Sequence, residues 1–128
     1  IVDQARGGQG CAIVHSDDEV GIQHLNQEAA KALSAGLRAG YEITKARAMR
    51  WITSNPAKAA GILDQTGTIE IGKDADLVIW NKNPFSVYAL TEYVFVDGAK
   101  AFVRGEKKLQ PVTDFDLGII QPQTNRVQ

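Results

Sequence analysis

The sequence predicts an α+β fold in which one buried strand and three helices precede an antiparallel sheet. The run CAIVH (residues 11–15) is short, apolar and partly β-branched, which is typical of a buried strand. Apolar residues then recur with helical spacing as far as Leu37. Two β-rich runs near the end flank the pair Asp97-Gly98. We therefore expect a helical first half and a β second half.

The first predicted helix follows the acidic residues Asp18 and Glu19 and ends before Gly40. An acidic or short polar side chain is favourable at a helix N-terminus, and glycine is a common stop at the C-terminus. Apolar side chains at spacings of three and four share one face of this helix. They are Ile22, Leu25, Ala29, Leu33 and Leu37.

Two shorter helices are predicted next. Thr44 is the expected N-cap of the second helix. In the third helix Asn55 is the expected N-cap, Pro56 takes the first helical position, and Gly61 ends the helix.

The second half alternates in the pattern of strands. TIEIG (68–72) and DLVIW (76–80) are predicted strands, with a turn at 72–74 between them. Pro84 ends the second run, because proline does not fit inside a ladder. YVFVDGAKAFVRG (93–105) is predicted to be a hairpin, since Asp-Gly suits a type I′ turn. Residues 111–128 are predicted to be a loop-like tail.

Composition excludes several classes of partner. The formal net charge of −1 argues against nucleic acid, and no apolar stretch is long enough for a membrane span. The first residues lack the apolar core of a signal peptide. The single cysteine, Cys11, excludes an internal disulfide and suits a reducing compartment, so we expect a cytoplasmic protein. Because the chain starts at Ile1 rather than Met, we expect a processed chain or part of a longer one.

Polar residues follow the first predicted strand, at His15, Ser16 and Asp17. In α/β folds, functional sites lie just beyond the carboxyl ends of such strands. In an extended chain His15 and Asp17 point to one side and Ser16 to the other. A carboxylate there can bind a metal or act as a general base. The alternative is a simple loop and helix N-cap, in which the helix dipole favours the acids.

Four motifs follow in order along the chain. They are TxNPAxxxG at 53–61, GxIExGKDADLVIW at 67–80, NPF at 83–85 and VFVDGxxxxxRG at 94–105. Together they strongly resemble the C-terminal end of metal-dependent amidohydrolases, in their imidazolonepropionase-like and peptidase-like branch. The resemblance covers about residues 11–105.

This resemblance implies a fragment of a two-part fold. Residues 1–62 would be the last strand and following helices of a (β/α)8 barrel. Residues 63–110 would be part of a composite antiparallel β-sandwich, with 111–128 as its tail. Asp17 matches the aspartate that the family places at the end of the eighth barrel strand, where it binds or faces the metal and takes a proton from the attacking water. His15 and Ser16 would flank that site and contact or support the substrate.

The resemblance also implies a divalent metal, zinc by expectation, and a small amide, cyclic amide or peptide substrate. The other metal ligands of the family come from barrel strands that this chain lacks. We therefore expect the chain alone to bind no metal tightly and to be inactive, with the missing N-terminal barrel segment as its partner. The alternative is a non-catalytic binding or assembly module derived from the sandwich.

No other strand in the first half can pair with residues 11–15, which implies neighbours that the chain does not contain. For the isolated chain we expect helices packed against the sheet, with residues 11–15 displaced or paired to another copy. Exposed barrel-facing apolar surface would favour a homo-oligomer.

Overall fold

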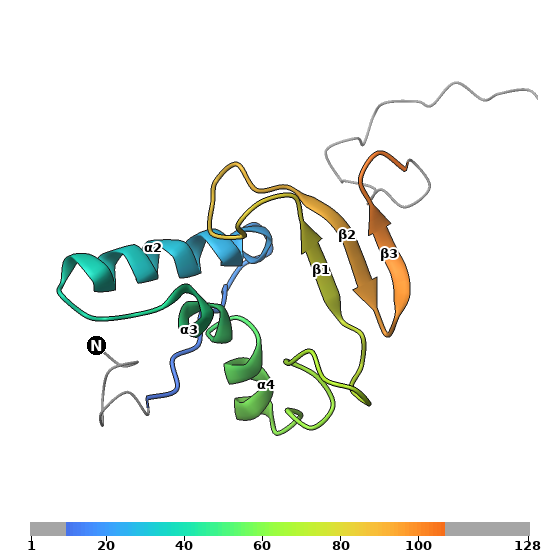
Figure 1. The fold of residues 1–128 in the computed structure, drawn as a ribbon, viewed down its shortest axis with the longest axis horizontal. Coiled ribbons are helices and arrows are strands. Elements are labelled where there is room, and N and C mark those ends of the chain that lie inside the picture. Colours follow the sequence, from blue (N-terminus) through green and yellow to red (C-terminus); the bar gives the residue numbers. More distant parts are fainter. Residues whose placement is uncertain (1–9, 107–128) are drawn as a thin grey trace, which may run out of the picture.

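The computed structural model describes residues 10–106, a small α+β arrangement with the helices first and an antiparallel sheet after them (Figure 1). Its elements are η2 (Gly21–His24), α2 (Leu25–Arg38), α3 (Lys45–Arg50), α4 (Ser54–Ala60), β1 (Leu77–Trp80), β2 (Thr91–Val96) and β3 (Ala99–Val103). No helix in this part of the chain is long and apolar enough to cross a bilayer. The predicted tail, residues 111–128, lies outside the described residues.

The core lies where α2 meets the end of α3. Ala29 and Leu33 of α2 are buried against Ala48 and Trp51. Residues from other segments pack around them half-buried: Ala12, Val14, Ile43, Ile52 and Phe85. The predicted apolar face of the helix is therefore buried only at its centre.

The predicted stop of the first helix is confirmed. Gly40 has a left-handed φ of 84°. The Tyr41 N–H donates to the Gly36 carbonyl and the Gly40 N–H to the Leu37 carbonyl, each at 3.1 Å. This double hydrogen bond is a Schellman motif, which satisfies carbonyls that the helix end would leave unpaired.

The start of α3 is also as predicted, but the start of α4 is not. Thr44 Oγ1 accepts a hydrogen bond from the Arg47 N–H at 3.1 Å. In α4 the N-cap residue is Thr53, so the prediction of Asn55 as the cap was wrong. Proline is tolerated throughout the first turn because the N–H groups there need no intrahelical partner, so Pro56 does not fix the boundary. Gly61 ends α4 with φ 77°, as predicted.

Residues 11–15 do not form the predicted strand. They are extended but pair with no strand of the described region. A strand needs a neighbouring strand for its ladder, and the only sheet between residues 10 and 106 is formed by β1, β2 and β3. The segment lies instead against the helices.

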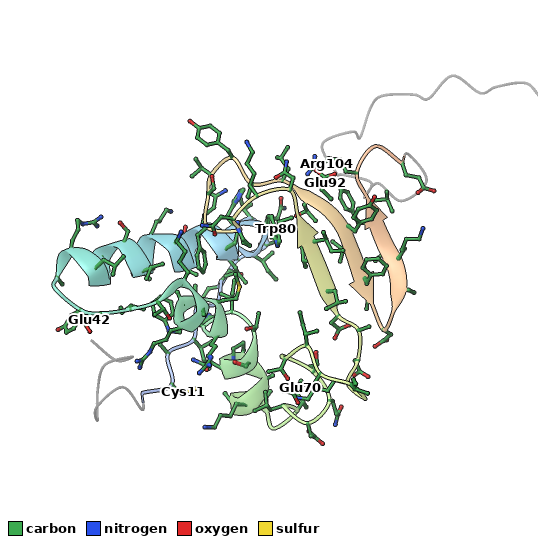
Figure 2. The ribbon with its side chains drawn as sticks, viewed as in Figure 1. Cys11, Glu42, Glu70, Trp80, Glu92 and Arg104 are labelled. Atoms are coloured by element: carbon green, nitrogen blue, oxygen red, sulfur yellow. The ribbon has the colours of Figure 1, made fainter. Side chains whose placement is uncertain are left out.

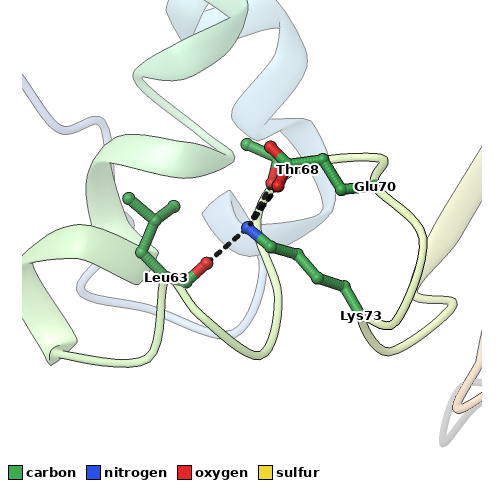
Figure 3. Close-up of polar contacts among 4 residues, drawn as sticks. All are labelled: Leu63, Thr68, Glu70 and Lys73. Carbon is green, nitrogen blue, oxygen red and sulfur yellow. Dashed lines mark hydrogen bonds and ion pairs between the residues drawn. The ribbon is translucent and has the colours of Figure 1, made fainter.

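The TIEIG run is likewise not a strand. Ile69 is 88% exposed and Ile71 is fully exposed. The turn at Gly72 forms, with the Lys73 N–H donating to the Glu70 carbonyl at 3.3 Å. The Lys73 side chain is only 12% exposed, and its Nζ donates to the Leu63 carbonyl and to Thr68 Oγ1 (Figure 3). This lysine therefore ties the loop between α4 and β1 together.

The sheet has the order β1-β2-β3 and is antiparallel throughout. Val94 of β2 pairs with Val78 on one side and with Phe102 on the other. Asp97 and Gly98 have φ values of 50° and 77°, the positive pair that a type I′ turn requires. The predicted hairpin is thus confirmed.

The expected packing of helices against the sheet was wrong for the described residues. No helix lies across a face of the sheet (Figure 1). The link is the loop 81–90, where Asn26 Nδ2 donates to the Pro84 carbonyl at 2.7 Å and Phe85 packs on the helical core. Val78 and Val96 of the sheet consequently stay about half exposed.

Candidate functional site

The candidate site is the extended segment that leads from Gly10 to the turn before η2. Alternate side chains face opposite ways, as expected for extended backbone. Ala12 and Val14 are half-buried against the helices and Ser16 is also half-buried, whereas Ile13, His15 and Asp17 are exposed. The prediction that His15 and Asp17 share a side, with Ser16 on the other, agrees with this geometry.

His15 and Asp17 lie close together at the end of the segment. His15 Nδ1 is 3.2 Å from Asp17 Oδ1, within ion-pair distance. Their side chains are 71% and 93% exposed, so both can reach a ligand or solvent. A carboxylate and an imidazole in this arrangement can accept protons or coordinate a cation.

Asp18 has a structural role. Its Oδ1 accepts hydrogen bonds from the Val20 and Gly21 N–H groups and so closes the turn that leads into η2. Asp18 thus has the role in a loop that was one of its two expected roles, whereas capping was wrong, because the N-cap residues of η2 and α2 are Val20 and His24. The two neighbouring carboxylates therefore have different roles: Asp18 stabilises the turn of the backbone, and Asp17 is exposed to solvent.

Two hydrogen bonds hold the segment against the helices. The Val14 N–H donates to the Trp51 carbonyl at 3.0 Å, and Asn55 Nδ2 donates to the Ala12 carbonyl at 2.7 Å. Sequence reasoning missed both contacts. The available signal was an asparagine in the first turn of a helix, where it is a poor helix former unless its amide has a partner.

No complete metal site forms within residues 10–106. No group of three or more His, Cys, Asp or Glu side chains converges there, and His24 is exposed at the start of α2. Cavities also lie along other parts of residues 10–106. One of about 370 Å³ borders Gly10 and Arg50 near the start of the segment, and one of about 290 Å³ lies between α2 and Phe85.

Cys11 lies at the start of this segment, whereas Glu92 and Arg104 lie on the sheet. Cys11 is free and exposed, on the helical side of the molecule (Figure 2). Glu92 and Arg104 form an ion pair of 3.4 Å on the sheet (Figure 2). These groups do not join His15 and Asp17 in one cluster.

The sequence model of the Amidohydrolase family matches residues 13–110. The chain belongs to the amidohydrolase family.

Individual relatives agree with this assignment. An imidazolonepropionase of Brucella suis is 54% identical over 41 residues, which are 32% of this chain and 10% of that protein. The amidohydrolase tasK of Hapsidospora irregularis is 33% identical over 96 residues, 73% of this chain and 9% of that protein. The crystal structure of an amidohydrolase from Thermotoga maritima superposes with a TM-score of 0.63 at 33% identity, covering 77% of this chain and 24% of that one. The matched region is thus a small part of each relative's length.

Proposed function

We propose that this chain is the C-terminal portion of an amidohydrolase that cleaves C–N bonds of an amide, cyclic amide or peptide with a metal-activated water. One observation carries the proposal: the exposed side chains of His15 and Asp17 lie 3.2 Å apart at the end of the extended segment. Both residues fall within the region that matches the family. Residues 1–62 would close a (β/α)8 barrel, 63–110 would contribute to a β-sandwich, and 111–128 would be a tail.

In this proposal Asp17 is the catalytic carboxylate. It accepts the proton of the attacking water and passes it to the leaving nitrogen, as a general base and then a general acid. His15, at 3.2 Å, and Ser16 flank it, and each contacts or supports the substrate. We also propose that the protein acts in the cytoplasm, because a single cysteine suits a reducing compartment.

A divalent metal, zinc by expectation, would lower the pKa of a bound water so that hydroxide is available near neutral pH. Asp17 offers one carboxylate to it, and an isolated carboxylate does not hold a catalytic metal, which needs about three protein ligands. Since no larger group of ligands forms in the described region, the remaining ligands would come from the N-terminal barrel segment. The chain alone is therefore proposed to be inactive.

A chimera tests the proposal. Residues 13–110 would replace the matching segment of the Thermotoga amidohydrolase, and zinc-loaded protein would be assayed against dipeptides, N-acyl amino acids and cyclic amides. Asp17→Asn should lower kcat by about 10²–10⁴-fold, the usual contribution of general acid–base catalysis. Glu19→Gln, an exposed acid two residues away, is the matched control and should stay close to the parent.

The other outcomes are equally informative. Full activity of the Asp17→Asn chimera would remove Asp17 from the mechanism. Turnover by the 128-residue chain alone would contradict its proposed inactivity. A folded, metal-loaded chimera without activity on any substrate would favour the binding or assembly module.

A further inference from the structure

The extended segment before Asp17 has no strand beside it in the described region, so another contact must set its orientation. Two hydrogen bonds and two side chains do this. The Val14 N–H and the Ala12 carbonyl bond to the corner between α3 and α4, and both side chains pack on the helical core. The segment is held on one edge by helix atoms.

Asn55 supplies the side-chain half of this contact. It is the second residue of α4, and Thr53 takes the N-cap position, so the amide is not used to cap its own helix. Asn55 Nδ2 instead reaches the Ala12 carbonyl at 2.7 Å, 43 residues earlier in the chain, in a part-buried position. A part-buried carbonyl that lost this donor would be left with only partial compensation for its desolvation.

The direction of Asp17 depends on this contact because side chains alternate along extended backbone. With the Ala12 and Val14 side chains turned inward, residue 17 must face outward, beside His15. A shift of the segment by one residue would turn the Asp17 carboxylate toward the helices.

We propose that Asn55 is a positioning residue, which fixes the backbone of residues 12–14 and thereby aims His15 and Asp17 out of the helical layer. The effect of Asn55 on catalysis rests on the proposed function. The hydrogen bond between Asn55 and Ala12 does not depend on that function, and it can be tested without an activity assay.

Hydrogen exchange of the complete 128-residue chain, followed amide by amide, tests the contact. Asn55→Ala should speed exchange of the Val14 amide about three- to tenfold, the loss of about one net hydrogen bond, with little change in the centre of α2. Asn26→Ala is the matched control, since Asn26 Nδ2 makes an equal 2.7 Å bond to a carbonyl, that of Pro84. It should leave Val14 unchanged.

A second variant allows the same test if the Asn55→Ala chain does not fold. Asn55→Asp keeps the size of the side chain and replaces the donor by an acceptor that repels the Ala12 carbonyl oxygen, so it should speed exchange of the Val14 amide at least as much as Asn55→Ala. The proposal is overturned if the Val14 amide is unprotected in the parent chain, if both Asn55 variants leave it unchanged, or if they speed all amides equally.

The consequence for catalysis is measured in the chimera. Asn55→Ala should lower kcat while KM stays near that of the Asn26→Ala chimera, because Asp17 is displaced and substrate binding is not. If Asn55→Ala speeds exchange of the Val14 amide but does not lower kcat, the contact is confirmed and the catalytic role of Asp17 is contradicted. A kcat effect without an exchange effect would overturn the positioning mechanism.

Discussion

His15 Nδ1 lies 3.2 Å from Asp17 Oδ1 although Ser16 separates the two residues in sequence. Extended backbone brings every second side chain to the same side, and the contacts of Ala12 and Val14 with the helices decide that this side faces solvent. The pair is thus a product of local backbone geometry and of the packing of Ala12 and Val14 on the helices.

The first prediction concerns the energetic role of this pair. His15→Gln should change the free energy of unfolding by less than about 0.5 kcal/mol, because exposed ion pairs contribute little. Trp51→Ala, at a side chain only 4% exposed, should cost about 3–5 kcal/mol in the same urea titration. A large loss from His15→Gln would assign the pair a structural rather than a chemical role.

Lys73 should matter far more than an ordinary surface lysine. Lys73→Met removes the hydrogen bonds to the Leu63 carbonyl and to Thr68 Oγ1, and should lower the free energy of unfolding by about 1.5–3 kcal/mol. Lys31→Met is the matched control: Lys31 pairs with Glu28 but is 71% exposed, so the loss should stay below about 0.5 kcal/mol. Equal losses in urea unfolding would show that the loop does not depend on Lys73.

The hairpin turn makes a backbone prediction. Gly98→Ala should destabilise the chain by about 1–2 kcal/mol, because φ is 77° and an L side chain is strained there. A new Cβ would meet only Ala75 Cβ at 3.8 Å, so the cost is conformational and not steric. Asp97→Asn keeps a residue that tolerates positive φ and should be nearly neutral by thermal unfolding. If both variants melt like the parent, the turn is not type I′ in solution.

Self-association is expected through exposed apolar side chains. We expect the contact to involve Ile69 and Ile71 in the loop before Gly72, because both side chains are exposed. Ile69→Lys combined with Ile71→Lys should shift the weight-average mass in sedimentation toward the monomer value of 13.9 kDa. Val20→Lys combined with Ile22→Lys, at positions 62% and 59% exposed, is the control. A parent chain that sediments as a monomer would contradict the prediction, and equal effects of both pairs would move the contact away from this loop.

Local features of the sequence determined much of this structure. The helix stop at Gly40, the cap at Thr44 and the turn at Asp97-Gly98 each depend on a few neighbouring residues, and each was predicted. That His15 and Asp17 share one side follows from the two-residue period of extended chain, whereas their outward direction depends on the contacts of Ala12 and Val14 with the helices. The motifs between residues 53 and 105 also sufficed to indicate the family.

Tertiary structure decided what depends on neighbours distant in sequence. CAIVH and TIEIG have strand-like patterns, but neither has a strand beside it among residues 10–106, and a strand without a ladder leaves its backbone groups to other partners. Asn55 was predicted to cap its own helix, whereas the Ala12 carbonyl, 43 residues away, takes its amide. Periodicity reports which side chains share a face, but only the folded chain shows which groups meet that face.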